Sequence, residues 1–405
     1  MKKIIFALFV MFIMIMHGNA LELNSKYAVL YNLNEEKILY EKNKDQQVSI
    51  ASLTKIMTAL VAIDSIKDFE EEVTITKDML RYLDDYNAYV IGLKVNQKVT
   101  YNDLLYGTLL PSGADCARAL AISIAGSEEE FVKLMNDKAK ELGLDNTYYK
   151  NCIGLDQKNQ YSTANEVAKL LLIALKNKKF EEVFTTKSYT LSNKSMTIYS
   201  SLVSNAKTYG LDISYFKGAK TGYTLDAGKC LASVALDSEN NIEYLLVTIY
   251  APTDNSKAYN IEDAIETYDY YFENYKYHNL IDKGDVILTL PAKYGKVKEV
   301  AIKAEEDIKY YLDNTFNKEK VTLKYTGVDI IKTGMNAGDK LGSIDIIYDG
   351  EVLKTVDVLL QEKVEFSVGA FLKENILGVL IFIAGIIFLT YISVIKKKKK
   401  KRRKR

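Results

Sequence analysis

Residues 50–61 read I-A-S-L-T-K-I-M-T-A-L-V, and this stretch decides the fold class. Its apolar residues Leu53, Ile56, Met57, Leu60 and Val61 recur at the spacing of one helical face, which predicts an amphipathic helix that begins near Ser52. Two short apolar runs precede it between residues 27 and 40 and flank a polar segment at 32–36, which is typical of a β-hairpin. We therefore predict a hairpin followed by a helix.

Further helices and then further strands are predicted up to residue 276. Helices are expected at residues 100–110, where Pro111 ends the helix, from the capping box Ser127-x-x-Glu130 to Gly143, and at residues 164–176. Strands are expected at residues 228–236 and 242–250, and a closing helix at 261–275. A sheet whose strands come from both ends of a segment, with a helical block inserted between them, predicts an α+β domain at residues 21–276.

The sequence changes to short alternating strands between residues 277 and 365. Strands are expected at residues 286–290, 297–302, 321–325, 344–347 and 352–360, which predicts a small all-β domain. This segment holds no convergent set of nucleophile, base and hydrogen-bond donors. We interpret it as a spacer, because function has to be argued from a site.

Both ends of the chain indicate a membrane. Lys2-Lys3, the uncharged run from Ile4 to Met16, and small residues at 18 and 20 are typical of a secretory signal peptide at residues 1–20, with a retained N-terminal anchor as the alternative. Residues 376–395 carry no charge and are long enough to span a bilayer. Residues 396–405 are all Lys or Arg, which predicts a single-pass cell-membrane protein with a cytoplasmic basic tail and an extracytoplasmic body.

Composition excludes several kinds of site. Twelve of the 54 basic residues lie in the two ends, so residues 21–395 hold 42 basic against 53 acidic groups, and no nucleic-acid partner is expected. The chain has two histidines, and one of them, His17, lies in the predicted signal peptide. A Ser-His-Asp triad or a multi-histidine zinc site is therefore not expected. Cys116, Cys152 and Cys230 have no C-x-x-C spacing and are interpreted as packed thiols.

The pattern S-x-x-K places a hydroxyl and an amine one helical turn apart, where a neutral amine can accept the hydroxyl proton. It occurs four times, at Ser52/Lys55, Ser204/Lys207, Ser214/Lys217 and Ser393/Lys396. Only Ser52 stands at the expected start of an amphipathic helix after a hairpin. The backbone N–H there lacks an intrahelical acceptor and is free to face an oxyanion.

Two further motifs follow in the chain. Ser112-Gly113-Ala114 lies in the break that Pro111 makes between two helices, where a second hydroxyl can relay a proton. Lys220-Thr221-Gly222 directly precedes a predicted strand, and a lysine and a hydroxyl on a strand edge suit an anionic ligand end. Each motif alone favours a helix cap or a turn, but all three in this order indicate an active site.

These three motifs resemble those of the penicillin-recognising serine enzymes, and the chain resembles a low-molecular-mass penicillin-binding protein of the D-alanyl-D-alanine carboxypeptidase family. The resemblance covers about residues 22–365. It includes Gly154-Leu155-Asp156 and Tyr161-Ser162-Thr163-Ala164 in the helical block, Ala227-Gly228 after the third motif, and the segment expected to be all-β. It implies a β-lactamase/transpeptidase-like catalytic domain.

The resemblance also implies the chemistry. Ser52 would attack the carbonyl between the two terminal D-alanines of a peptidoglycan stem peptide, Lys55 would accept its proton, and Ser112 would relay a proton to the leaving D-alanine. Water would then cleave the acyl-enzyme, and β-lactam antibiotics would acylate the same serine. No metal or organic cofactor is needed.

The substrate would be held by the third motif. The resemblance implies that Lys220 and Thr221 bind the terminal carboxylate, that Gly222 lets the substrate backbone approach, and that the N–H groups of Ser52 and Tyr223 bind the oxyanion. From the residues themselves, Lys55 can act as a base only if burial or a nearby cation lowers its pKa, and Lys220 is expected to supply that cation.

Two residues depart from the family pattern. Ala114 stands where the family's middle motif has Asn, and Lys217 stands where the family usually has Asp before the third motif. Three alternatives therefore stay open: a β-lactamase, a D,D-endopeptidase that uses the same site, and a non-catalytic peptidoglycan-binding scaffold. An E-x-x-L-N segment, which would indicate a β-lactamase, is absent between Ser112 and Lys220.

Overall fold

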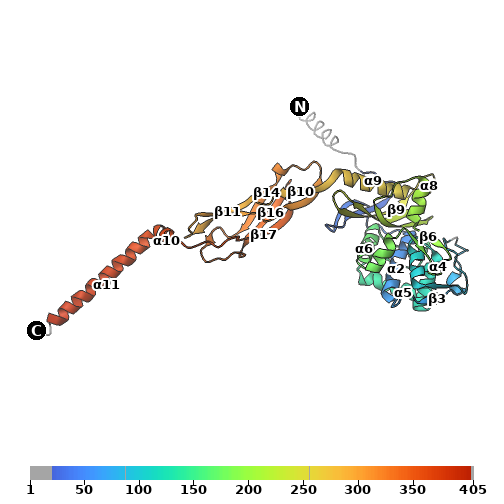
Figure 1. The fold of residues 1–405 in the computed structure, drawn as a ribbon, viewed down its shortest axis with the longest axis horizontal. Coiled ribbons are helices and arrows are strands. Elements are labelled where there is room, and N and C mark those ends of the chain that lie inside the picture. Colours follow the sequence, from blue (N-terminus) through green and yellow to red (C-terminus); the bar gives the residue numbers. More distant parts are fainter. Residues whose placement is uncertain (1–20, 87, 255, 403–405) are drawn as a thin grey trace, which may run out of the picture. The chain divides into compact units, whose positions relative to one another are not determined.

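The computed structural model describes residues 21–86, 88–254 and 256–402, and it divides after Glu273 into two compact units (Figure 1). The predicted signal peptide, residues 1–20, lies outside the described residues. The first unit is an α+β domain and the second is built of β-strands followed by an apolar helix.

A five-stranded antiparallel sheet forms the frame of the first unit. Its strand order is β2-β1-β9-β8-β7, so β1 of the N-terminal hairpin pairs with β9, which begins more than 200 residues later. This arrangement confirms the prediction of a sheet built from both ends of the segment. The strands are β1 (Tyr27–Asn32), β2 (Lys37–Lys42), β7 (Phe216–Thr224), β8 (Gly228–Asp237) and β9 (Ile242–Ala251).

Helices cover both faces of this sheet. The C-terminal helix α9 (Tyr259–Asn274) lies against one face, and the helical block that contains α6 (Ala164–Leu175) packs against the other (Figure 1). Eight of the ten residues of β8 are buried, as expected for a strand that is covered on both sides. The hydroxyl of Tyr268 on α9 donates a 3.0 Å hydrogen bond to the carbonyl oxygen of Ser233 on β8, and this bond joins the helix to the sheet.

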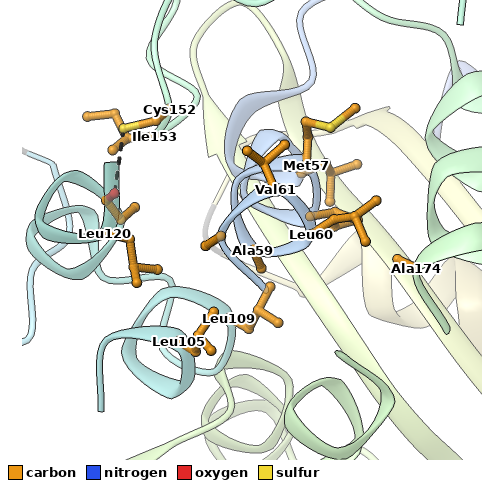
Figure 2. Packing of buried hydrophobic residues seen from close by; sticks show 14 of the residues in the cluster. Met57, Ala59, Leu60, Val61, Leu105, Leu109, Leu120, Cys152, Ile153 and Ala174 are labelled. Carbon is orange, nitrogen blue, oxygen red and sulfur yellow. Dashed lines mark hydrogen bonds between the residues drawn. The ribbon is translucent and has the colours of Figure 1, made fainter. Parts of the chain in front are cut away.

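Helix α2 (Thr54–Ser65) runs through the centre of the helical block. It follows a short 3₁₀ turn, η1 (Ala51–Leu53), so the predicted start near Ser52 is confirmed. The predicted amphipathic pattern is wrong, because every residue of α2 from Thr54 to Ile63 is buried. Figure 2 shows Met57, Leu60 and Val61 of α2 packed among residues of the surrounding helices. A helix enclosed on all sides has no solvent face to carry polar residues.

The predicted helices around α2 are confirmed with small shifts at their ends. Thr100 begins α3 with a full capping box that it forms with Asp103, while at Ser127 only the serine half of the box is present. The block comprises α3 (Tyr101–Leu109), α4 (Ala114–Ala125), α5 (Glu128–Glu141), α6, α7 (Lys178–Thr185) and α8 (Ser201–Tyr209), with the 3₁₀ turn η2 (Asp78–Leu80).

Two short antiparallel strand pairs in this block were not predicted, since each strand has only three residues. They are β3 (Glu72–Thr74) with β4 (Lys98–Thr100), and β5 (Ser188–Thr190) with β6 (Thr197–Tyr199). Such short strands carry too few alternating residues for a periodic signal.

The second unit contains the predicted all-β domain. Its sheets have the orders β10-β13, β12-β11-β15 and β14-β16-β17 around one apolar core. Strands β10, β13 and β15 were not predicted. The elements are β10 (Tyr275–Ile281), β11 (Val286–Lys293), β12 (Glu299–Lys303), β13 (Ile308–Asp313), η3 (Lys318–Lys320), β14 (Thr322–Gly327), β15 (Ile331–Lys332), β16 (Lys340–Tyr348) and β17 (Glu351–Leu359).

Two helices end the chain, α10 (Val368–Glu374) and α11 (Ile376–Arg402). Within α11, residues Ile376–Lys400 are long and apolar enough to cross a membrane, with a mean hydropathy of 2.6 in their most apolar window. This agrees in position with the span predicted at residues 376–395.

Candidate active site

A cavity of about 850 Å³ opens in the first unit where the three sequence motifs meet. Helix α2 and its preceding turn, the break between α3 and α4, and the edge strand β7 each contribute one motif. The predicted site residues that line the cavity are Ser52, Lys55, Ser112, Thr221, Gly222 and Tyr223. Lys220 is not among the lining residues, and its side chain is fully buried.

The Lys55 amine points at the Ser52 hydroxyl. Nζ of Lys55 lies 2.9 Å from Oγ of Ser52, and it also donates to the carbonyl oxygen of Ile153 at 2.7 Å. The two side chains lie one turn apart, as the S-x-x-K spacing predicted. The contacts with Ser52 and Ile153 together fix the direction of the Lys55 amine.

Burial lowers the pKa of Lys55 from its usual 10.5 to about 8, and the nearby Cys152, Asp115 and Cys116 act weakly in the other direction. Burial also lowers the pKa of Lys220 well below its usual value, and the charge of Lys55 lowers it further. The sequence predicted that burial or a nearby cation, supplied by Lys220, lowers the pKa of Lys55. Burial is the main cause, and Lys220 is not among the groups that shift this pKa.

The loop 151–156 supplies the carbonyl that Lys55 binds. Oδ1 of Asn151 accepts hydrogen bonds from the N–H groups of Ile153, Gly154 and Leu155, at 3.2, 2.7 and 3.1 Å, and so closes the loop into a tight turn. Gly154 has φ +83°, and a Cβ at this position would lie 2.0 Å from the carbonyl oxygen of Ala51. Only glycine allows the loop to pack this closely against the turn that carries Ser52.

Strand β7 approaches the same turn from the other side. A Cβ on Gly222 would lie 3.2 Å from the backbone nitrogen of Ser52, so glycine leaves the space in front of that N–H open. Thr221 lies on the same strand, and its hydroxyl is 2.6 Å from that of Ser201 at the start of α8. Behind them, Lys220 donates to the carbonyl oxygen of Thr221 at 2.7 Å.

Backbone strain occurs at two of the motifs. Ala51, directly before Ser52, has φ +46°, and Ser112 has φ +73°, in the left-handed region that non-glycine residues rarely adopt. Strain of this kind costs on the order of 1–3 kcal/mol and is concentrated at functional sites. Ser112 also lines the cavity.

Both units of the chain resemble known protein families. Residues 14–253 match the family model described as D-alanyl-D-alanine carboxypeptidase. The chain belongs to this family. Residues 275–366 match the C-terminal domain of penicillin-binding protein 5.

Similar proteins align along most of the chain. The D-alanyl-D-alanine carboxypeptidase DacF of Bacillus subtilis is 30% identical over 84% of this chain and 85% of its own length, and DacC of Escherichia coli is 30% identical over 83% of each. The crystal structure of penicillin binding protein 5 from Haemophilus influenzae superimposes with a TM-score of 0.62, at 24% identity, over 86% of this chain and 99% of that one. The transpeptidase-like fold is thereby confirmed, and the protein is a serine-type carboxypeptidase.

The first departure from the carboxypeptidase family pattern, Ala114, begins α4 and is 2% exposed. The neighbouring Asp115 does not replace the missing amide. Its carboxylate accepts hydrogen bonds from the N–H groups of Ile91, Gly92 and Leu93, at 3.1, 3.0 and 3.0 Å. Asp115 therefore fixes a loop at the cavity wall.

The second departure, Lys217, lies outside the cavity lining. Its amine forms a 2.6 Å ion pair with Glu243 on β9 and is 4.0 Å from Glu181 of α7. Lys217 therefore forms an ion pair between two strands of the sheet and does not change the cavity lining.

Several residues of the carboxypeptidase site were missed from the sequence. The carbonyl of Ile153, the side chain of Asn151 and the hydroxyl of Ser201 all come from segments that carry no motif of their own. Asp156 was noted only as part of the family resemblance; it accepts hydrogen bonds from Ser49 at 2.6 Å and Thr224 at 2.8 Å. The Gly-Leu-Asp run was the one signal that could have indicated this loop.

The packing of Gly154 can be tested with a matched control. Gly143 also has a left-handed backbone, with φ +66°, but a Cβ there meets nothing within 4 Å. We expect Gly143→Ala to cost about 1–2 kcal/mol from the backbone alone. Gly154→Ala should cost at least about 3 kcal/mol, because its methyl also clashes with backbone. Denaturant unfolding monitored in the catalytic unit measures both, and equal losses would contradict the close packing.

Proposed function

We propose that this carboxypeptidase removes the terminal D-alanine from peptidoglycan stem peptides through an acyl-enzyme on Ser52. The observation that carries the assignment is the 2.9 Å contact between Nζ of Lys55 and Oγ of Ser52 in a cavity that also holds Ser112 and Thr221. Ser204 also lines this cavity, but it lies on α8 and its hydroxyl bonds to the carbonyl of Ser200.

In the first step, neutral Lys55 accepts the proton of Ser52 as Oγ attacks the carbonyl carbon of the penultimate D-alanine. The oxyanion binds to the N–H groups of Ser52 and Tyr223. The C–N bond then breaks, and the leaving amine takes a proton from Lys55 through the hydroxyl of Ser112. Lys55 is thereby neutral again for the second step, in which it accepts a proton from the water that attacks the ester. Ser52 then takes this proton from Lys55 as the bond between the acyl group and Oγ breaks.

Strand β7 is suited to hold the peptide. It lies at the edge of the sheet, so one of its two sides has no neighbouring strand, and an extended substrate can pair with it. The hydroxyls of Thr221 and Ser201 are positioned to bind the terminal carboxylate. Lys220 does not line the cavity, but its positive charge, when the amine is protonated, favours the bound carboxylate without direct contact.

The matches to carboxypeptidases over more than four fifths of the chain do not favour the β-lactamase, endopeptidase or scaffold alternatives. A β-lactamase also requires a base for rapid deacylation. Asp156 is the only carboxylate among the described residues that line the cavity, and its oxygens already accept hydrogen bonds from Ser49, Thr224 and Asp226.

Penicillin labelling tests the assignment of Ser52. We expect Ser52→Ala to abolish the covalent adduct and D-alanine release, whereas Ser204→Ala, on the same cavity wall, should keep both. Lys55→Ala should slow acylation at least about 10²-fold, the usual scale for removing an acid–base group. Peptide mapping by mass spectrometry locates the adduct, and an adduct on Ser204 or Ser214 would refute the assignment.

We also propose that the enzyme is secreted through the signal peptide at residues 1–20 and anchored by a span at residues 376–395. The proposal rests on the apolar helix within α11 and on the basic residues from Lys396 onward. Ten Lys or Arg residues are costly to move across a bilayer, so the tail stays in the cytoplasm and the catalytic unit outside. The enzyme would then bind its substrate and its β-lactam inhibitors on the outer side of the membrane.

Protease protection tests this orientation. External protease on intact spheroplasts should digest the catalytic unit and spare a tag placed after Arg405. Permeabilised cells, in which the tag is expected to be digested, provide the control. Loss of the tag in intact spheroplasts would overturn the proposed topology.

A further inference from the structure

We propose that Glu128 is a positioning residue for Lys55: its carboxylate holds the segment Cys152–Ile153 so that the Ile153 carbonyl aims the Lys55 amine at Ser52. The inference rests on the proposed function and extends it to a residue that does not line the cavity. Glu128 lies at the first position of α5, and its side chain is 11% exposed.

Glu128 binds the segment from one side. Its Oε1 accepts hydrogen bonds from both the backbone N–H and the thiol of Cys152, each at 3.2 Å. The thiol also lies 3.7 Å from the carbonyl oxygen of Ala117 on α4, the contact drawn as a dashed line in Figure 2. Burial and the neighbouring Glu128 charge raise the pKa of the Cys152 thiol well above its usual value, so it remains a donor to the carboxylate.

Helix α2 binds the same segment from the other side. The Thr58 hydroxyl donates to the carbonyl oxygen of Cys152 at 2.6 Å, and one turn earlier Lys55 donates to the carbonyl oxygen of Ile153 at 2.7 Å. Two successive carbonyls are therefore held by two side chains on one face of α2. The segment is fixed between the α2 side chains and Glu128.

The buried negative charge of Glu128 is compensated by hydrogen bonds to its second carboxylate oxygen, Oε2. Oε2 accepts a 2.9 Å hydrogen bond from the guanidinium of Arg118, which is 1% exposed, and another from the hydroxyl of Tyr82. The guanidinium also stacks over the Tyr82 ring at 4.0 Å and donates to the carbonyl oxygen of Met79. Every polar group of this cluster has a partner, which is the condition under which a buried charge cluster rigidifies its surroundings.

The link to catalysis is the direction of the Lys55 amine. An amine that loses the Ile153 carbonyl is held by Ser52 alone, and a misplacement of about 1 Å can cost about 10²-fold in rate. The carbonyl also favours the protonated amine, since a carbonyl oxygen only accepts hydrogen bonds. Releasing it therefore lowers the pKa of Lys55.

Other groups that act on Lys55 remain in place when Glu128 is changed. Asp115 and Cys116 act on it from α4, and the charges of Lys55 and of Lys220 on β7 repel each other, whereas Cys152 belongs to the segment that Glu128 holds. The effect of Glu128 is therefore separable from those of Asp115, Cys116 and Lys220.

The test uses Glu128→Gln in the full-length protein. Glutamine has one acceptor oxygen for two sets of donors, and the Arg118 guanidinium is the stronger donor, so the Cys152 segment is released. The rate constant for acylation of Ser52 by penicillin should fall about 10- to 10²-fold. In a plot of this rate constant against pH, the rising limb should move about 0.5–1 unit toward lower pH. Loss of folded protein alone would reduce the amplitude without moving the limb.

Two other variants complete the test. Asp64→Asn breaks the 3.0 Å ion pair with Lys138, which joins the same helices α2 and α5 away from the loop, and it should leave the pH limb unchanged. Thr58→Val removes the hydroxyl that holds the Cys152 carbonyl and should shift the limb in the same direction as Glu128→Gln, by less.

The outcomes separate the inference from the proposed function. If the wild type forms no adduct on Ser52, the proposed function and the inference both fail. If the wild type is acylated but neither Glu128→Gln nor Thr58→Val moves the limb, only the inference is overturned. Thr58→Val also decides the matter if Glu128→Gln does not fold.

Discussion

The burial of the Lys55 amine against the Ser52 hydroxyl is the contact on which the rest of the catalytic unit depends. An ammonium group inside a protein is costly, so the surroundings must either bind it or favour its neutral form. This structure does both: Ile153 and Ser52 accept its hydrogen bonds, while burial lowers its pKa to about 8. A lysine with this pKa can act as a base near neutral pH, which an exposed lysine cannot.

The fold supplies what this buried amine requires. Helix α2 is buried from Thr54 to Ile63, which leaves Lys55 only 2% exposed at the cavity but removes the solvent-facing stripe of an ordinary surface helix. Gly154 and Gly222 then let a loop and a strand approach the turn before α2 from two directions. The price is backbone strain at Ala51 and Ser112, which the packed surroundings hold in place. The Lys55 amine, the loop with Gly154, strand β7 and the strained turns are thus parts of one arrangement.

Much of this could be predicted from the sequence. The periodic segments gave the hairpin, the main helices and the insertion of a helical block into a sheet, because these signals extend over many residues. The motifs likewise indicated Ser52, Lys55, Ser112 and Thr221, since the residues within each motif are close together in the sequence. The buried position of Lys220 could not be predicted, because pattern reasoning does not tell which face of an edge strand is covered. Nor could the Ile153 carbonyl, since a backbone acceptor has no residue type that marks it.

The pH dependence of acylation tests the central claim that Lys55 is the base. Only the neutral amine can accept the Ser52 proton, so the second-order rate constant for penicillin should rise about tenfold per pH unit below the pKa of Lys55 and level off above about 8. Measurement between pH 5.5 and roughly 10, with the label mapped to Ser52, decides the matter. A rate that is flat across this range, or that still rises at pH 10 as an ordinary lysine would require, would contradict the account.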